Sequence, residues 1–270
     1  MAVITISRGS YSMGKMVAEQ VADKLGYRVI SRDLLLEASE RFNIPEIMLT
    51  HAIHDAPSVL ERFRHGTQAY IAYIRAALAE RICGDNVVYH GLAGHLLLKG
   101  IPGVLKVRIT TDLQRRVANE MRRENIDAQT ATESILKDDQ QRRKWTKTLH
   151  GVDPWDSNLY DLVICIDTLT ADDAVEFICR ATESAGFRAT PQSLQKMKDF
   201  AIACRIKAEL VDDFPSAGIT CQYGNIIIYA KVKEPAKVKL LAKLEKIRQH
   251  ISGIHNLEIH APDPMPKEAV

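Results

Sequence analysis

The first thirty residues constrain the fold more than any other part of this sequence. A short run rich in β-branched residues, AVITIS, leads directly into Gly9-Ser-Tyr-Ser-Met-Gly14-Lys15, with Met16 next. In the pattern G-x-x-x-x-G-K, successive backbone amides and the lysine surround phosphate oxygens. Apolar residues then recur at helical spacing over 17–25, and YRVI predicts a second strand. This order of strand, glycine-bearing turn, helix and strand predicts a βαβ unit.

Predicted strands and helices continue to alternate up to about residue 186. Further strands are expected at 86–90, 103–109 and 160–167, and helices at 33–42, 58–83, 112–124, 127–149 and 170–186. This alternation predicts an α/β fold, with a parallel sheet that carries helices on both faces. The strand at 160–167, YDLVICID, is apolar enough for both of its faces to be buried.

The pattern changes near residue 188, where a polar connector, RATPQS, contains a proline. Beyond it we expect an αββαβ unit, with a hairpin turn at Gly224-Asn225. Its elements are a helix at about 192–211, strands at 217–223 and 226–232, a helix at 235–250 and a strand at 255–260. We therefore predict two domains, 1–188 and 192–262, followed by a loose tail.

The composition argues against several classes of protein. The net charge of +2, from 36 basic and 34 acidic residues, gives no general attraction to nucleic acid. The sequence contains no apolar run approaching the roughly 20 residues of a membrane span. The five cysteines are scattered and form no C-x-x-C pair, so we expect neither a disulfide framework nor a bound structural metal. A cytoplasmic protein without a signal peptide fits these features.

Met16 stands where this loop pattern normally has a serine or threonine that helps to hold Mg²⁺. A thioether is a poor ligand for a hard cation. Ser10 or Ser12 could replace that hydroxyl, or phosphates and water could hold most of the ion. The other interpretation is a loop that binds a nucleotide without efficient catalysis. The residues expected to contact the donor nucleotide are Gly9, Ser10, Tyr11, Ser12, Met13, Gly14, Lys15 and Met16.

Two histidines, His90 and His95, flank GLAG at the end of the predicted third strand. Ligands of parallel sheets bind at the carboxyl ends of the strands, so either histidine is a candidate for contact with an acceptor. A packed or capping histidine is the alternative, and base rates favour it.

A basic cluster lies near the C-terminus, and it has two interpretations. It could bind an anionic ligand, or it could be the solvated face of an amphipathic helix. Leucines and isoleucines at 240, 244, 247 and 251 form a core stripe, which favours the second interpretation. The cluster consists of Lys231, Lys233, Lys237, Lys239, Lys243, Lys246 and Arg248.

Several segments together resemble the cytidylate kinase-like branch of the P-loop nucleoside monophosphate kinases. These are ITISRGSYSMGKMVAEQVADKLGYRVISRDLL, VVYHGLAGHLLL, TDLQRRV, ILKDDQQRRKW and LYDLVICIDTL, and they cover about residues 1–186. The resemblance implies a P-loop NTPase-type sheet with strand order 2-3-1-4-5 and a mobile helical lid. It also implies transfer of the γ-phosphoryl group of ATP, with Mg²⁺, to a nucleoside monophosphate.

The resemblance also assigns roles to single residues. Lys15 and Arg116 match the cations that act on the transferred phosphoryl group, and Asp139 and Arg142 match the D-x-x-R of the lid. Arg32 matches an arginine of the acceptor segment. Ser31, beside it, stands where the family has an aspartate.

Leu92 and Ala93 replace an arginine and a glycine of the family's G-R-G-G segment. With Ser31, these departures put a cytidylate acceptor in question. The C-terminal αββαβ unit is similar to a BON domain, which implies an interaction module with a protein or anionic partner. We therefore expect a nucleoside monophosphate kinase. A non-catalytic nucleotide-binding regulator that signals through the BON-like unit and a kinase of another small acceptor are the alternatives.

Overall fold

The computed structural model describes residues 3–9, 12–31, 66–84, 86–91, 93–261 and 264–270. The chain divides into two compact units, and each is described by itself. The first comprises Met1–Val59, Asp85–Lys99 and Gly103–Ala189, and the second comprises Leu60–Gly84, Gly100–Pro102 and Thr190–Val270. The expected helix at 33–42 lies outside the described residues.

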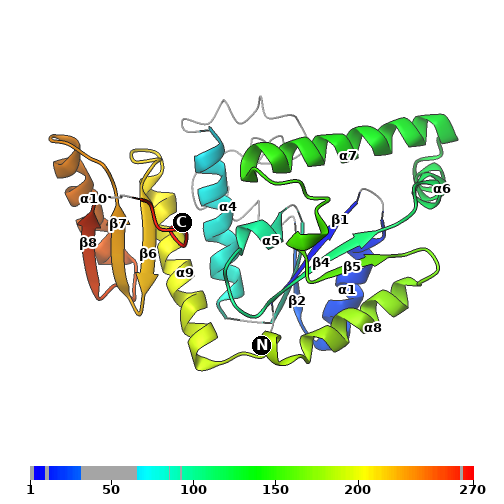
Figure 1. Cartoon of the computed structure of the whole chain (residues 1–270), viewed down its shortest axis with the longest axis horizontal. Coiled ribbons are helices and arrows are strands. Elements are labelled where there is room, and N and C mark those ends of the chain that lie inside the picture. The colour runs from blue at the N-terminus through cyan, green and yellow to red at the C-terminus, as the bar shows by residue number, and fades with distance from the viewer. Residues whose placement is uncertain (1–2, 10–11, 32–65, 85, 92, 262–263) are drawn as a thin grey trace. The chain divides into compact units, whose positions relative to one another are not determined.

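The first unit contains a five-stranded parallel sheet (Figure 1). Its strands lie in the order β2-β3-β1-β4-β5, which confirms the expected α/β fold and strand order. Their bounds are β1 (Val3–Arg8), β2 (Arg28–Ile30), β3 (Val87–His90), β4 (Val104–Thr110) and β5 (Leu162–Cys165).

The two faces of this sheet differ in chemistry. Ile4, Ile6 and Val107 point into an apolar core that they share with α1 (Gly14–Leu25) and α8 (Ala171–Thr182). The residues between them in β1 point to the opposite face. There, α5 (Gly94–Leu97) packs so closely that a Cβ on Gly94 would lie 3.3 Å from Cβ of Thr5. Helices therefore cover both faces of the sheet, as expected.

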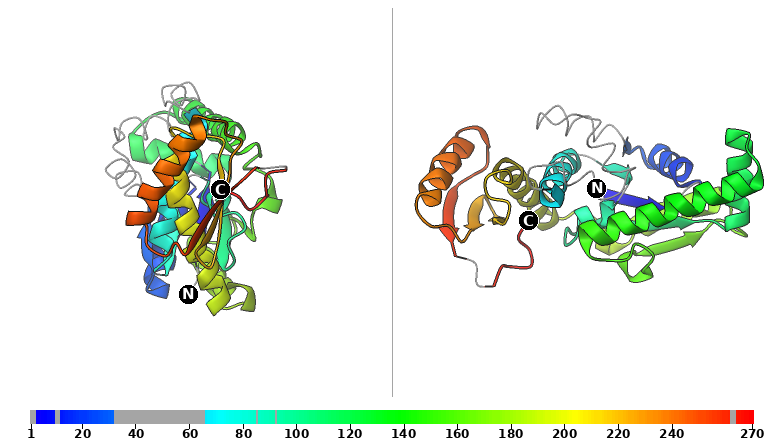
Figure 2. Two further views of the ribbon diagram at one scale, coloured as in Figure 1. Left: turned by 90° about the vertical axis from the view of Figure 1, so that its left-hand side faces the viewer. Right: turned by 90° about the horizontal axis from the view of Figure 1, so that it is seen from above.

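Two further helices belong to the described part of this unit (Figures 1 and 2). They are α6 (Leu113–Glu124) and α7 (Ala128–His150), and short 3₁₀ turns follow at Ser157–Leu159 and Ala185–Phe187. Asp112 caps α6 by accepting from the amides of Gln114 and Arg115.

The expectation that 160–167 forms a strand buried on both faces is wrong. β5 is the edge strand of the sheet, and Val163 at its centre is 48% exposed. A run of apolar residues does not distinguish a central strand from an edge strand, because that depends on which segment pairs next to it.

The second unit has the predicted αββαβ order. The elements are α9 (Pro191–Leu210), β6 (Gly218–Gln222), β7 (Asn225–Tyr229), α10 (Ala236–His250) and β8 (Asn256–His260). The strand order in the sheet is β6-β7-β8. β6 and β7 pair antiparallel, and β7 and β8 pair parallel. Residues 240, 244, 247 and 251 are buried in its core, and the lysines of α10 lie outside it, so the core-stripe interpretation is confirmed.

The second unit also includes α4 (Gly66–Ile82), which precedes β3 in the sequence. Its Tyr73 hydroxyl donates to Asp212 at 2.8 Å, and Glu80 pairs with Arg205 of α9 at 3.8 Å. Tyr73 and Glu80 lie on the same face of α4 because they are seven residues apart, or about two helical turns. The division into domains at 1–188 and 192–262 stays a prediction.

The end of the chain is not loose. Val270 exchanges two backbone hydrogen bonds with Ile219 of β6, at 3.0 and 3.3 Å. Met265 fills the space beside Gly218, where a Cβ would lie 2.4 Å from the sulfur. The tail is therefore held by the strand edge, which offers unpaired backbone groups. The sequence of the tail, APDPMPKEAV, is rich in proline and charged residues and does not predict this pairing.

The β6–β7 turn is formed by Tyr223 and Gly224, both with positive φ, because Gln222 pairs with Asn225. The turn therefore lies one residue earlier than predicted. Asp199 of α9 is 5% exposed, and its carboxylate accepts from the amides of Tyr223 at 2.9 Å and Gly224 at 3.3 Å.

We expect Asp199→Ala to lower the free energy of unfolding of this unit by about 3 kcal/mol, because it leaves buried donors without an acceptor. Urea denaturation followed by circular dichroism measures the loss, and amide exchange at Tyr223 and Gly224 shows where protection falls. Glu245→Ala on the exposed side of α10 is the control and should stay within about 0.5 kcal/mol of the parent. Unchanged exchange at the turn would contradict this role.

Among the described residues, no helix combines the length and apolar character needed to cross a bilayer.

Candidate active site

The loop between β1 and α1 is held in place by its neighbours. Met13 adopts a left-handed conformation, with φ 61°, immediately before α1 begins at Gly14. A Cβ on Gly14 would lie 2.7 Å from Cβ of Arg8, so only glycine fits there. Ser10 and Tyr11 lie outside the described residues.

Ser12 is fully buried and its hydroxyl turns inward. Its Oγ lies 2.9 Å from the carbonyl oxygen of Gly9 and 3.3 Å from that of Ile109, and it donates to these acceptors. Because Ser12 is fully buried between the loop and β4, its oxygen is not open to an arriving ion, and the structure gives no support to Ser12 as a replacement for the missing Mg²⁺ ligand. Met16 is 39% exposed.

Lys15 lies on the exposed side of the first turn of α1. Its side chain is 64% exposed, and Nζ is 3.6 Å from Glu19. An exposed ion pair of this kind contributes little stability, so an arriving phosphate can compete with Glu19 for the ammonium group.

Arg116 and Asp139 meet beside the loop. Their side chains come from α6 and α7 and form an ion pair of 2.7 Å, with only 11% and 14% of the side chains exposed. The guanidinium carbon of Arg116 lies 3.8 Å from the position that a Cβ on Gly9 would occupy. The structure thus brings two of the sequence-predicted residues together next to the first glycine of the loop.

Next to Gly9 is a hollow on the face of the sheet that also carries α5. Arg142, another sequence-predicted residue, lines it. Three more arginines and two aromatic residues also line it, and most of these have no sequence signal as site residues. The lining is Ser7, Arg8, Gly9, Gly91, Ala93, His95, Arg108, Arg142, Arg143, Thr146, Pro154, Trp155 and Tyr160.

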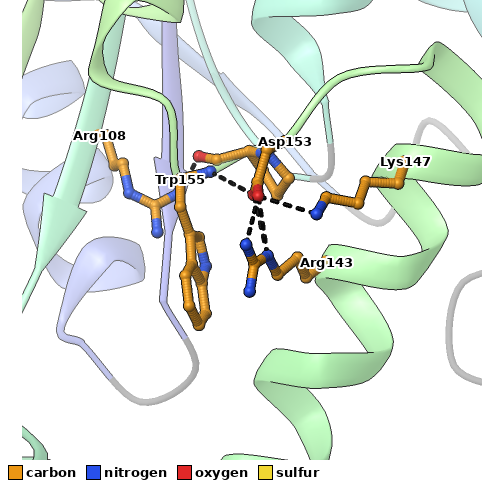
Figure 3. Close-up of polar contacts among 6 residues, drawn as sticks. Arg108, Arg143, Lys147, Asp153 and Trp155 are labelled. Atoms are coloured by element: carbon orange, nitrogen blue, oxygen red, sulfur yellow. Dashed lines mark hydrogen bonds and ion pairs between the residues drawn. The ribbon is translucent and has the colours of Figure 1, made fainter.

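Asp153 organises the wall of this hollow (Figure 3). Its carboxylate accepts from Nε of Arg143 at 2.9 and 3.0 Å, and Nζ of Lys147 lies 2.9 Å away. The amide of Trp155 also donates to it, at 3.1 Å. These donors, Arg143 first, hold the pKa of Asp153 well below its usual range.

The arginines on the wall have defined orientations. The guanidinium of Arg143 lies 4.3 Å from the ring centroid of Trp155. Arg108 donates to the carbonyl oxygen of Pro154 at 2.7 Å, and its guanidinium carbon is 5.7 Å from the ring centroid of Tyr160. A hollow with this lining favours a compact anion, because guanidinium groups donate several hydrogen bonds to oxyanions.

The two candidate histidines lie in different places. His90 is buried at the end of β3 and is not among the residues that line the hollow. His95 lines it, is 4% exposed, and contacts the ring of Tyr160 in a tilted arrangement, with 4.5 Å between the ring centroids. Burial lowers the pKa of His95 to about 3, and the nearby charges of His150, Arg108 and Lys106 act in the same direction. Burial also raises the pKa of Tyr160.

The acceptor-side prediction is only partly covered by the structure. Ser31 follows β2, whereas Arg32 and Leu92 lie outside the described residues. Among the residues that are described, no group of three histidine, cysteine or acidic side chains is placed to hold a metal ion. Arg108 is the residue that the sequence could have indicated, since Lys106, Arg108 and Thr110 alternate with apolar residues in β4.

Comparison with protein families gives a match over residues 3–168, to the cytidylate kinase-like family. The chain belongs to this family. The match covers the loop, α4, α6, α7 and β5, and it ends at residue 168, before α8 and α9. No curated protein matches this kinase-like chain.

One solved structure supports the fold of the first unit, and two others are less similar. An uncharacterized protein from Eubacterium ventriosum ATCC 27560 is 22% identical, with a TM-score of 0.52, over 68% of this chain and 99% of that one. TT1252 from Thermus thermophilus is 16% identical, with a TM-score of 0.45, over 68% and 98%. Shikimate kinase from Bacteroides thetaiotaomicron is 12% identical, with a TM-score of 0.42, over 68% and 99%. The last two likenesses are too weak to carry an argument.

Proposed function

We propose that this kinase-like chain is an ATP-dependent phosphotransferase that transfers the γ-phosphoryl group to a nucleoside monophosphate, as cytidylate kinases do. The observation that carries the proposal is the loop from Gly9 to Met16 between β1 and α1, with Arg116 lying against it. Phosphoryl transfer depends mainly on positioned cations, and Lys15, Arg116 and Arg142 supply them here.

Each part of the site has a role in this proposal. The amides at the start of α1 and Lys15 hold the phosphates of the donor. The arginine-lined hollow beside Gly9, which includes Arg142, receives the acceptor. The helices α6 and α7 act as the lid that excludes water, so that ATP is not hydrolysed.

The residues of the loop are better suited to bind the phosphates of ATP than to bind Mg²⁺ directly. Gly14 can only be glycine, and Lys15 is available on the surface, which suits a polyphosphate. The Ser12 hydroxyl faces carbonyl oxygens and position 16 is a methionine, so these two positions offer Mg²⁺ no hydroxyl ligand. In our proposal Mg²⁺ arrives with ATP and keeps phosphate and water oxygens as its main ligands.

Release of ADP in a coupled assay, with a panel of ribo- and deoxyribonucleoside monophosphates, tests the proposal. We expect one or more acceptors to stimulate ADP release well above the rate with ATP alone. Tight binding of ATP without stimulation by any acceptor would reject the kinase hypothesis and favour a non-catalytic nucleotide-binding regulator. Stimulation only by a small acceptor that is not a nucleotide would favour a kinase of another small molecule.

Replacing Met16 tests the metal arrangement. We expect Met16→Thr to lower the Mg²⁺ concentration needed for half-maximal activity, because it restores a hard oxygen ligand beside Lys15. Activity measured against Mg²⁺ concentration at saturating ATP gives the shift, and Met16→Leu is the control without oxygen. If turnover appears only in Met16→Thr and is absent from the natural protein, the regulator interpretation is correct.

We also propose that the second unit is a BON-like interaction module, for a protein or anionic partner, in a cytoplasmic enzyme. Its αββαβ order and exposed lysines on α10 support this. Two of these lysines are already engaged, since Lys239 and Lys243 contact Asp213 at 2.9 and 2.6 Å. Pull-down with the second unit intact, compared with a variant lacking residues 190–270, tests the assignment.

A further inference from the structure

The hollow contains a large aromatic side chain that remains exposed to solvent. Trp155 is 51% exposed, whereas Tyr160, which lines the same hollow, is 8% exposed. An indole left in water forgoes the free energy of burying its apolar surface. Single exposed aromatic residues are common on proteins, so the way in which this ring is held decides whether it indicates a ligand.

Asp153 fixes both the backbone and one face of Trp155 (Figure 3). The amide of Trp155 donates to its carboxylate at 3.1 Å, and Nε of Arg143 donates to the same carboxylate at 2.9 and 3.0 Å. The guanidinium carbon of Arg143 then lies 4.3 Å from the centroid of the indole, in a cation–π contact. The ring is therefore positioned before a ligand arrives, which reduces the entropic cost of binding.

The opposite face of the indole is open. Since Arg143 covers one face, the exposed part of Trp155 consists of the other face and the ring edges. Among the residues that the structure describes, no second cation and no other ring stacks on Trp155. A planar aromatic ring makes the largest contact with such a face, because stacked rings touch over much of their area. Nucleobases stack on aromatic side chains in this way, whatever their hydrogen-bonding pattern.

The charges of the hollow favour a ligand that is also an anion. Arg108 and Arg142 line it together with Trp155. Arg108 makes its side-chain hydrogen bonds through one terminal nitrogen, at 2.7 and 3.5 Å, so within the described residues its other guanidinium nitrogens are open to a ligand. Arg143, by contrast, is already bound by Asp153. An oxyanion can therefore bind Arg108 and Arg142 while a ring attached to it lies on the indole.

We propose that the hollow binds a nucleoside monophosphate with its base stacked on the open face of Trp155 and its phosphate held by Arg108 and Arg142. The inference rests on the proposed function in taking the hollow as the acceptor side of the enzyme, and it adds the group that recognises the base. Trp155 is then a specificity-determining residue, which selects nucleotides over phosphorylated sugars. Arg143 is a positioning residue that holds the ring. None of the segments that resemble cytidylate kinases contains Trp155.

Ribose 5-phosphate is the matched probe, because it carries the same sugar and phosphate without a base. Calorimetric titrations compare its affinity for the full chain with those of AMP, CMP, GMP and UMP, while a non-hydrolysable ATP analogue fills the loop beside Lys15. We expect at least one nucleotide to bind about tenfold or more tightly than ribose 5-phosphate and to quench the fluorescence of Trp155, because stacking adds contact that the sugar phosphate lacks. Equal affinities, which would also result if the indole received the sugar, would overturn the proposal.

Variants of Trp155 test the origin of the preference. Trp155→Phe keeps an aromatic ring and should keep most of the preference, while the quenching is lost with the indole. Trp155→Leu should lower the preference toward one and leave the affinity for ribose 5-phosphate nearly unchanged. Trp145 is 4% exposed, so its emission in both variants reports whether the first unit is folded. Full preference in a folded Trp155→Leu variant would also overturn the proposal.

Arg143→Gln tests the positioning role. It removes the cation from the covered face and releases the ring, so we expect the preference for the nucleotide to fall severalfold and quenching of Trp155 by acrylamide to increase. Arg122→Gln, at an exposed position of α6 outside the lining of the hollow, is the control and should change neither. An arginine that serves the fold alone would leave the preference unchanged, and that result would reject the role of Arg143.

These readouts separate the inference from the proposed function. Quenching of Trp155 and preference for a nucleotide, without ADP release in the coupled assay, would reject the kinase alone. ADP release that nucleoside monophosphates stimulate with the same KM in the parent and in Trp155→Leu would reject the role of Trp155 alone.

Discussion

Lys15→Ala is expected to reduce phosphoryl transfer by about 10²–10³-fold. Lys15 is the first charged residue of α1, and its side chain is 64% exposed beside the loop. It is therefore able to follow the donor phosphates and to balance the charge that develops on the transferred group. The coupled assay gives the rate, and titration with a non-hydrolysable ATP analogue gives the accompanying loss of affinity.

Lys24→Ala is the matched control, because Lys24 is an exposed lysine in the last turn of the same helix. It should change neither rate nor affinity. Lys15→Arg keeps the charge and should recover part of the activity, since a guanidinium does not replace the compact ammonium fully. Unchanged nucleotide binding in Lys15→Ala would contradict the phosphate-binding role of the loop and, with it, the proposed function.

Asp139→Asn is expected to destabilise the first unit by about 3 kcal/mol and to lower activity. The substitution removes the carboxylate charge that lies 2.7 Å from Arg116, whose side chain is only 11% exposed. Breaking a buried pair from one side is costly for this reason. Both tryptophans of the chain, Trp145 and Trp155, belong to the first unit, so their fluorescence in urea reports its unfolding separately from the second unit.

Asp167→Asn is the control for an exposed pair. Asp167 lies 3.8 Å from Arg115, both side chains are largely solvated, and the expected cost is below about 1 kcal/mol. Replacing both buried partners, as Arg116→Met with Asp139→Leu, should recover much of the lost stability without recovering activity. A double variant that is fully active would show that the pair serves structure alone.

Much of the fold follows from local patterns. The apolar stripe of α1 and the hairpin between β6 and β7 depend on neighbours in the sequence, so they could be predicted, although the turn lies one residue earlier than expected. The segments that resemble cytidylate kinases added the strand order β2-β3-β1-β4-β5, which no single segment contains.

The candidate site was predictable only in part. Arg116, Asp139 and Arg142 were found through motifs, and the structure places them beside the loop or in the hollow next to it. Arg108 and Tyr160 were not found. Their importance comes from their contacts with Pro154 and His95, and those contacts join segments that are far apart in the sequence.

The sequence by itself determined the alternation of strands and helices, the phosphate-binding loop with its unusual Met16, and the αββαβ order of the second unit. These features depend on periodicity and on the conformations available to neighbouring residues. Only the tertiary structure decided that β5 is an edge strand, that the chain end pairs with β6, and that four arginines line one hollow together with His95. Burial, charge and tautomer at a site depend on which distant segments pack together, and no local pattern carries that information.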